Sequence, residues 1–278
     1  MDNREINRVL HIISGLDIGG AEKCLNDVVV NSSNEFLHHS VVSLSGDGFY
    51  TEKIKKIGIQ VYSLEMIGFF KSVVSLVQLM AILIKIRPHI IHGWMNHGNL
   101  FSMLGVIVRS NPQPCIYWNI RQSLDGINTL KASTRVIIWL NKFLSKFAKT
   151  IIYNSTLARK QHEAFGYSEK NSLVIPNGFD SNLLSPCPTT KKEFRNQHGL
   201  MNDQMLVGHI GRYHPMKDHE TFIAASVLVL KSFPRTKFIL VGKDVSLLLS
   251  QSQALLVDEV RKQFIILDEC SDVASILR

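Results

Sequence analysis

The chain has 278 residues, of which 45% are hydrophobic and 19% charged, which excludes a disordered or fibrous protein and allows one large or two medium-sized domains. Its formal net charge of +8 favours anionic partners such as nucleotides, lipid surfaces or nucleic acid, without choosing among them. The four cysteines stand far apart without a C-x-x-C pair, so neither a disulfide framework nor a zinc site is expected.

Short apolar runs alternate with helix-length amphipathic segments through the first part of the chain. Strands are expected at residues 9–13, 39–44, 60–64, 89–92, 115–119, 150–153 and 173–175. Helices are expected at residues 21–31, 51–57, 72–86, 99–108, 132–148 and 155–165. Because strands separated by helices form βαβ units, the sequence predicts an α/β protein with a parallel sheet, whose first domain covers residues 1–178.

The alternation stops at Pro176-Asn177-Gly178 and restarts at residue 206. Residues 179–202 lack a strand signal and are expected to link two domains and to hold a short helix. Strands at 206–210, 237–241 and 264–267, with helices near 218–231 and 245–262, predict a second Rossmann-like domain over residues 203–278. Ser271 is a good N-cap for one more helix, and the sequence ends just beyond it. We therefore expect the second domain to be incomplete.

Two segments bear on membranes and export. The N-terminus is charged and then strand-like, which is not typical of a signal peptide. The most apolar stretch, residues 73–86, contains Gln78 and Lys85, so a buried helix is expected there rather than a membrane span. A cytoplasmic protein is the resulting expectation.

A glycine-containing turn, Ser14 to Lys23, follows the first strand. It lacks the G-x-G-x-x-G pattern, and no acidic residue ends the second strand, which disfavours a dinucleotide-binding site. Gly19 and Gly20 would still let a ligand approach the backbone at the start of a helix. The alternative is a plain strand-to-helix turn.

The strand at residues 206–210 leads into Gly211, and Arg212 and Lys217 follow before a helix expected to open at Asp218. Free backbone N–H groups and the helix dipole attract an anion to such a turn. Two cations predict an anion with more than one charge, such as a diphosphate. The alternative is a solvated basic turn.

Four stretches, in order, resemble the family 4 (group 1) retaining glycosyltransferases, which have the GT-B fold of two Rossmann-like domains. They are VLHIISGLDIGGAEK (residues 9–23), HGWMNHGNL (92–100), LVIPNGFD (173–180) and GHIGRYHPMKDHETF (208–222). The resemblance implies transfer of a sugar from a nucleoside-diphosphate donor to a glycan or lipid-linked acceptor, in the synthesis of a surface polysaccharide or glycolipid. It implies no metal ion and no other cofactor.

The resemblance also implies roles for particular residues. Arg212 and Lys217, beside Gly211, match the residues that hold the donor diphosphate, and as catalytic residues they would stabilise the negative charge that grows on the leaving group. Gly19 and Gly20 match a loop of the first domain that contacts donor phosphate or acceptor.

His97, Arg121 and the helix at 132–148 each allow a functional and a structural interpretation. His97, after the fourth strand, would hydrogen-bond a sugar hydroxyl or bond to the backbone at a helix start. Arg121 stands where many relatives carry a histidine, and it would act on a phosphate or acidic acceptor or pair with a carboxylate. The helix at 132–148 has a basic face that would rest on an anionic membrane, at the inner face of the cell membrane, or would simply face solvent.

The family's later E-x7-E pair, which binds the donor sugar and the ribose, does not occur here, and Glu269 lacks its partner and context. We therefore expect a fragment with little or no transferase activity. The main alternative to an enzyme is a non-catalytic remnant or binding subunit of a glycosyltransferase. A nucleic-acid binder is disfavoured because no basic stripe interleaved with aromatic residues is present.

Overall fold

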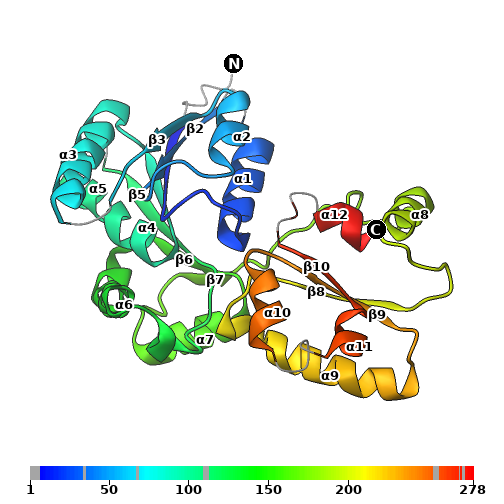
Figure 1. Ribbon diagram of the computed structural model, residues 1–278. Helices are drawn as coiled ribbons and strands as arrows, with labels where there is room; N and C mark the ends of the chain where they lie inside the picture. Colours follow the sequence, from blue (N-terminus) through cyan, green and yellow to red (C-terminus); the bar gives the residue numbers. More distant parts are fainter. Residues whose placement is uncertain are drawn as a thin grey trace. The chain divides into compact units, whose positions relative to one another are not determined.

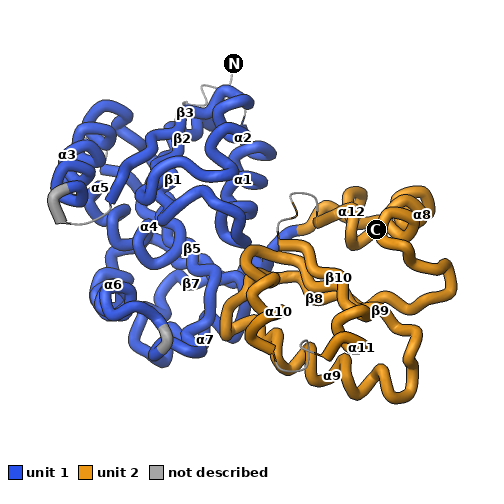
Figure 2. Tube along the Cα trace, viewed as in Figure 1, with its two compact units in different colours: residues 1–178 blue, residues 179–278 orange. Residues whose placement is uncertain are grey.

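The computed structural model describes residues 7–33, 36–66, 69–108, 113–252, 257–268, 270 and 273–278. Glu269 and the expected N-cap Ser271 lie outside the described residues. The chain divides into two compact units, Met1–Gly178 and Phe179–Arg278 (Figure 2). The segment expected to link the domains, residues 179–202, belongs to unit 2 and contains a helix.

The described part of unit 1 holds a seven-stranded sheet in which all neighbouring strands are parallel. Its strands are β1 (Asn7–Ile13), β2 (Leu37–Ser43), β3 (Gln60–Ser63), β4 (Ile90–Trp94), β5 (Cys115–Ile120), β6 (Thr150–Tyr153) and β7 (Ser172–Val174). The strand order is β3-β2-β1-β4-β5-β6-β7, which contains the 3-2-1-4-5-6 order of a doubly wound sheet. The α/β prediction is thereby confirmed.

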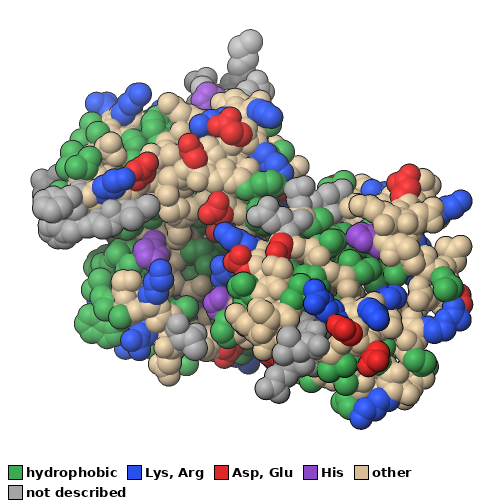
Figure 3. All heavy atoms as spheres, in the orientation of Figure 1, with side chains coloured by type: hydrophobic (Ala, Val, Ile, Leu, Met, Phe, Trp, Pro, Cys, Tyr) green, Lys and Arg blue, Asp and Glu red, His purple; other side chains and the backbone are tan. Residues whose placement is uncertain are grey.

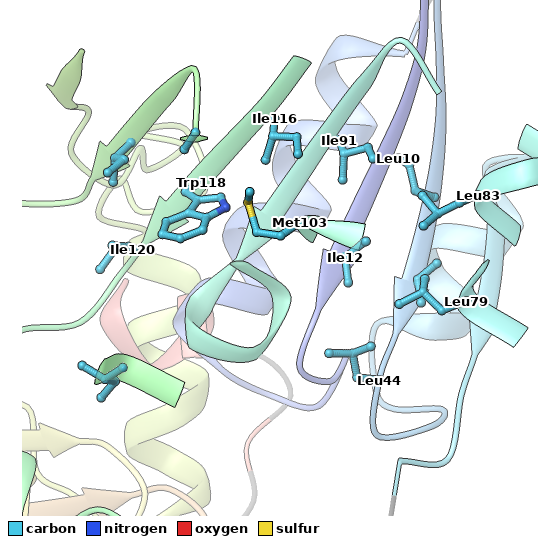
Figure 4. Close-up of a cluster of buried hydrophobic side chains, with 14 of the residues drawn as sticks. Leu10, Ile12, Leu44, Leu79, Leu83, Ile91, Met103, Ile116, Trp118 and Ile120 are labelled. Atoms are coloured by element: carbon cyan, nitrogen blue, oxygen red, sulfur yellow. The ribbon is translucent and has the colours of Figure 1, made fainter. Parts of the chain in front are cut away.

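Helices cover both faces of this sheet (Figure 1). They are α1 (Gly20–Ser32), α2 (Thr51–Lys56), α3 (Phe69–Ile86), α4 (Met95–Ser102), α5 (Leu104–Ile107), α6 (Ala132–Leu144) and α7 (Thr156–Phe165), with 3₁₀ turns η1 (Ile127–Thr129) and η2 (Ser145–Phe147). Leu25 of α1 and Ile54 of α2 pack with Ile13 on one face. On the other face, Leu79 and Leu83 of α3 join a larger core with β1, β4 and β5 (Figure 4).

The helix after β4 begins earlier than the sequence predicted. It starts at Met95 rather than Asn99, directly after the strand and without a loop, and Met95 has the left-handed φ of 62°. Gly98 permits this because α4 crosses β1 at backbone contact: a Cβ on Gly98 would lie 2.1 Å from the carbonyl oxygen of Ile12. The apolar pattern that we expected to open a helix at residue 99 therefore continues one that has already formed.

Unit 2 contains a three-stranded parallel sheet among the described residues, with strand order β10-β9-β8. The strands are β8 (Leu206–Ile210), β9 (Lys237–Val241) and β10 (Phe264–Leu267), at the expected positions. The helices and 3₁₀ turns are α8 (Pro188–Gln197), η3 (Pro215–Lys217), α9 (His219–Ser232), η4 (Val245–Leu247), α10 (Leu248–Gln251), α11 (Asp258–Arg261) and α12 (Val273–Leu277). Ile223 of α9, Leu240, Val245 and Leu248 form the core.

The single helix predicted over residues 245–262 is wrong. Buried Ser252 adopts an extended backbone with ψ of 119° and hydrogen-bonds Glu220 of α9 at 3.2 Å, which ends α10 after one turn. A separate helix, α11, begins at Asp258.

A chain of hydrogen bonds between neutral histidines lies beneath α1 in unit 1. The Trp94 indole N–H donates to Nδ1 of buried His11 at 3.1 Å, so the ring proton of His11 is on Nε2 and faces Nδ1 of His39 at 2.9 Å. Nε2 of His39 in turn faces the Ser32 hydroxyl at 3.1 Å, and that hydroxyl donates to the carbonyl of Val28. Burial, and then repulsion from two neighbouring histidines, holds the pKa of His11 well below its ordinary value.

The low pKa values of His11 and His92 predict that the protein loses stability in mild acid. Burial, and then the charge of Arg121, lowers the pKa of His92 to about 3. Below about pH 6.5 these two histidines are therefore protonated in the unfolded protein while they stay neutral in the folded protein. The free energy of unfolding should thus fall by about 1.4 kcal/mol per pH unit for each such histidine. Urea unfolding between pH 7 and pH 5 measures this slope, and His11→Gln should flatten it. A slope that is the same in His11→Gln, with exposed His38→Gln as the control, would contradict the prediction.

Candidate functional site

The carboxyl edge of the unit 1 sheet gathers the residues that the sequence singled out in this unit. In a doubly wound sheet, ligands bind outside the carboxyl ends of the strands where the strand order reverses, which here is between β1 and β4. Gly19 and Gly20 follow β1, His97 follows β4 and Arg121 follows β5. The structure therefore brings these three features to adjacent strands at one edge.

Gly19 is the N-cap residue of α1, and Gly20 is its first residue. A Cβ on Gly19 would lie 2.2 Å from a carboxylate oxygen of Glu22, so this carboxylate covers the N-terminus of the helix. The preceding turn is held by the Tyr50 N–H, which donates to the Leu16 carbonyl at 2.8 Å. An anion at Gly19 would meet the Glu22 carboxylate, which makes this turn more suitable for hydroxyl groups than for phosphate.

His97 lies within the first turn of α4 and is half-buried. Burial lowers its pKa, so the ring is neutral near pH 7. The hydrogen bonds of the described residues do not include this ring, although the neighbouring Asn96 carbonyl accepts one from the Asn141 amide at 2.9 Å. The backbone-bonded interpretation of His97 thus has no support among these bonds, and a neutral imidazole can still meet a ligand hydroxyl.

Arg121 is half-buried and held by two side-chain amides. Its Nε donates to Oδ1 of Asn119 at 2.9 Å and its Nη1 donates to Oδ1 of Asn177, while the guanidinium lies 5.7 Å from the ring centre of Trp94. Within the described ranges no carboxylate forms an ion pair with Arg121. The alternative in which Arg121 only pairs with a carboxylate therefore has no support there. Because amides do not cancel its charge, Arg121 keeps a positive field at the carboxyl end of β5.

In unit 2, the turns after β8 and β9 are fastened to each other. The Gly211 N–H donates to the Val241 carbonyl at 2.7 Å, and the Tyr213 N–H donates to the Lys243 carbonyl at 2.8 Å. Gly242 permits this approach, because a Cβ there would lie 2.3 Å from the Gly211 carbonyl oxygen, and its φ is +149°. The turn that carries the predicted cations therefore has a fixed backbone.

The two predicted cations lie in this turn. The aliphatic part of Lys217 crosses Gly211, where a Cβ would lie 3.3 Å from its Cδ. Arg212 and Lys217 are both exposed, and the ion pairs of the described residues include neither of them. The structure thus brings Gly211, Arg212 and Lys217 together in one turn, with both charges available to a ligand.

The helix after this turn begins close to the predicted residue, and its N-terminus carries a carboxylate. Asp218 precedes α9 as its N-cap with φ of 50°, and its Oδ1 accepts from the Thr221 N–H at 3.4 Å. A carboxylate therefore already occupies the N-terminus of the helix. An anion in this turn would be held by the side chains of Arg212 and Lys217 more than by the dipole of α9.

Sequence reasoning missed two histidines that shape the turn. Nε2 of His219 lies 3.1 Å from the Gly211 carbonyl and Nε2 of His209 lies 2.9 Å from the Lys217 carbonyl, so the two rings hold both ends of the segment. Because a carbonyl oxygen only accepts, each ring donates from Nε2, whereas Nδ1 of each ring is buried and has no hydrogen-bond partner among the described residues. Their symmetric places at the two ends of the motif were the available signal.

Neither a metal site nor a membrane-spanning helix occurs among the described residues. No group of three or more His, Cys, Asp or Glu side chains in these ranges is arranged to hold a metal ion. None of the helices described is both long and apolar enough to cross a membrane.

Among proteins of known sequence, one relative supports the interpretation of these motifs. No protein-family model matches the chain. The chain is 22% identical over 251 residues to the "Putative glycosyltransferase EpsF" of Bacillus subtilis (strain 168), which covers 86% of this chain. The chain spans only 63% of the length of that relative.

Solved structures give the fold class more firmly. Anabaena Alr3699/HepE in complex with UDP-glucose is similar with a TM-score of 0.78 and 19% identity, over 97% of this chain and 71% of that one. Sucrose-phosphate synthase from Thermosynechococcus elongatus is similar with a TM-score of 0.70 and 14% identity, over 98% of this chain and 72% of that one. The chain thus has the α/β fold of the GT-B type, as the sequence predicted.

Proposed function

We propose that this chain is part of a retaining glycosyltransferase of family 4 type, and that it contains the site for the donor diphosphate and contacts to the acceptor. The whole enzyme would transfer a sugar from a UDP-sugar donor to a glycan or lipid-linked acceptor in surface polysaccharide or glycolipid synthesis, and we propose that this chain alone has little or no such activity. The donor is proposed as a UDP-sugar because the HepE structure contains UDP-glucose, and the surface-polymer role is proposed from the similarity to EpsF.

The observation that carries the proposal is the fixed turn after β8 with its two cations. A diphosphate needs charge and hydrogen-bond donors at set positions, and Arg212 and Lys217 offer both from a backbone held by Gly242, His209 and His219. As the sugar–phosphate bond breaks, negative charge grows on the leaving diphosphate, so fixed cations stabilise the transition state more than the ground state. These cations supply the charge that a metal ion supplies elsewhere, and we propose that none is needed.

In unit 1 we assign the acceptor contacts to the carboxyl edge of the sheet. Neutral His97 and the turn at Gly19 and Gly20 suit hydroxyl groups, whereas Arg121 offers a positive charge to an anionic group of either substrate.

Calorimetry with UDP and UMP tests the proposal on the chain as it stands. UDP should bind more tightly than UMP, by about 10-fold or more, because the second phosphate adds charge-assisted hydrogen bonds, and the preference should persist in EDTA. Equal affinities for UDP and UMP would refute the diphosphate site. A second arm follows release of UDP from UDP-glucose with and without glycan acceptors, and robust transfer by this chain alone would refute the proposed lack of activity.

A further inference from the structure

Helix α6 presents an apolar surface to solvent. Ile138, Asn141 and Ser145 face the core, whereas Trp139 is 52% exposed on the opposite side. Other large apolar side chains follow it at helical spacing, and they are Val136, Leu140, Phe143 and Phe147. The rings of Trp139 and Phe143 touch edge to face, with centres 4.6 Å apart. An aromatic stripe of this size is unusual on a surface that faces water.

Positive charges border this stripe. Lys131, Arg135 and Lys146 are exposed, and the segment from residue 131 to residue 149, which contains α6 and η2, has no acidic residue. The asymmetry extends well beyond α6. From Glu65 to Glu163 the sequence has 12 lysine and arginine residues and three acidic ones, a net charge of +9 against +8 for the whole chain. Two of these cations, Lys71 and Arg159, pair with the carboxylates at the two ends of the segment.

Three helices of this segment lie in one layer of unit 1. Helices α3, α5 and α6 cover one face of the sheet, since Leu79 of α3 and Ile138 of α6 belong to one core cluster and Leu104 of α5 packs against it. The outer sides of α3 and α5 also expose apolar residues, which are Val73, Val74, Val77, Ile84, Val106 and Ile107. Where Figure 1 labels α6, Figure 3 shows hydrophobic side chains gathered at the surface beside Lys and Arg side chains. The layer is therefore apolar and cationic on its outside.

We infer that the outer surface of α6 docks on an anionic lipid bilayer. An aromatic and aliphatic stripe bordered by lysine and arginine is the pattern of a helix that lies in the lipid headgroup region. The charge selects an anionic surface, because cations near such a membrane each gain attraction from its negative potential, whereas a neutral protein partner would not need this excess. The inference does not depend on the proposed sugar transfer, since lipid binding is measured without any donor.

Trp139 is a reporter for this docking. The chain has three tryptophans, and Trp94 and Trp118 are fully buried. Vesicles in which about a third of the lipid is phosphatidylglycerol should shift the Trp139 emission to shorter wavelength, and brominated acyl chains should quench it. Vesicles of phosphatidylcholine alone should have much less effect. Absence of any shift or quenching with the anionic vesicles would overturn the inference.

Matched variants separate the two contributions in vesicle co-sedimentation. Arg135→Gln with Lys146→Gln should weaken partitioning on the order of 30-fold, and Phe143→Ser with Phe147→Ser should weaken it by about 10-fold or more. The controls remove the same groups from unit 2: Lys191→Gln with Lys192→Gln on α8, and Leu228→Ser with Phe233→Ser. Both controls should bind vesicles like the parent protein.

Unfolding midpoints of all four variants check that each one folds. Binding that persists in both α6 variants, or is lost equally in the controls, would overturn the inference. So would self-association, measured by ultracentrifugation without lipid, that the Phe143→Ser and Phe147→Ser changes abolish in a protein that ignores vesicles. That result would make α6 a protein–protein interface instead.

Discussion

The Arg212→Ala variant should bind UDP about 10- to 100-fold more weakly than the parent protein, and this is the largest effect on function that we expect from a single side chain. Arg212 is exposed and forms no ion pair within the described ranges, so no carboxylate there neutralises its charge. A hydrogen bond to a charged group contributes about 1.5–3 kcal/mol, which corresponds to this range of affinity. Calorimetry at constant ionic strength measures the change.

A control for this prediction is Arg235→Ala in the same unit. Arg235 precedes β9 at the opposite end of the sheet and pairs with Asp203 at 2.9 Å on the exposed surface. Such a pair contributes little, so this variant should keep the parent affinity and stability. If Arg212→Ala binds UDP as the parent does, the donor site lies elsewhere. If Arg235→Ala weakens binding equally, only the net charge matters.

The Gly98→Ala variant should lose about 3 kcal/mol or more of unfolding free energy. The added Cβ would lie 2.1 Å from the carbonyl oxygen and 3.0 Å from the carbonyl carbon of Ile12, and a backbone atom cannot move aside as a side chain does. Either α4 must shift away from β1 or the strand must bend. Urea unfolding followed by circular dichroism gives the free energy.

Gly20→Ala is the control for this change, because it is also a glycine-to-alanine change within a helix of unit 1. A Cβ on Gly20 would meet no heavy atom within 4 Å apart from its chain neighbours and the backbone of its own helix. Stability should therefore stay constant or rise by up to about 1 kcal/mol. Equal stability of Gly98→Ala and the parent would show that α4 does not press on β1. A loss of acceptor use in Gly20→Ala at unchanged stability would support a ligand contact at this turn.

The strands were predictable because apolar runs in parallel sheets are short and continuous, and β6, β8, β9 and β10 begin and end at the expected residues. The helix boundaries at Met95 and Ser252 were not predictable. Each depends on a tertiary contact, of Gly98 with Ile12 and of Ser252 with Glu220, that no local pattern reports.

In the candidate site, too, the residues were predictable from the sequence, whereas their tertiary contacts were not. Arg212 and Lys217 could be found from sequence because they follow an apolar run and a glycine. The fixation of their turn could not, since it depends on Gly242, which is remote in sequence, and on the hydrogen bonds of His209 and His219 to the backbone. Likewise, Arg121 was recognisable as a candidate, whereas its partners Asn119 and Asn177 required the folded sheet edge.

The fastened turn at residues 211–218 has a kinetic consequence. Ordering a flexible backbone costs about 1–2 kcal/mol of conformational entropy per residue. Here hydrogen bonds within the unit already order the turn before a ligand binds, so binding does not include that cost. Association with UDP should then proceed in one step, at a rate set by diffusion and by the attraction of the two cations, and should slow as salt screens them. Variants that keep both cations should therefore change how long UDP stays bound, whereas loss of Arg212 or Lys217 should also slow its association and reduce the dependence of that rate on salt.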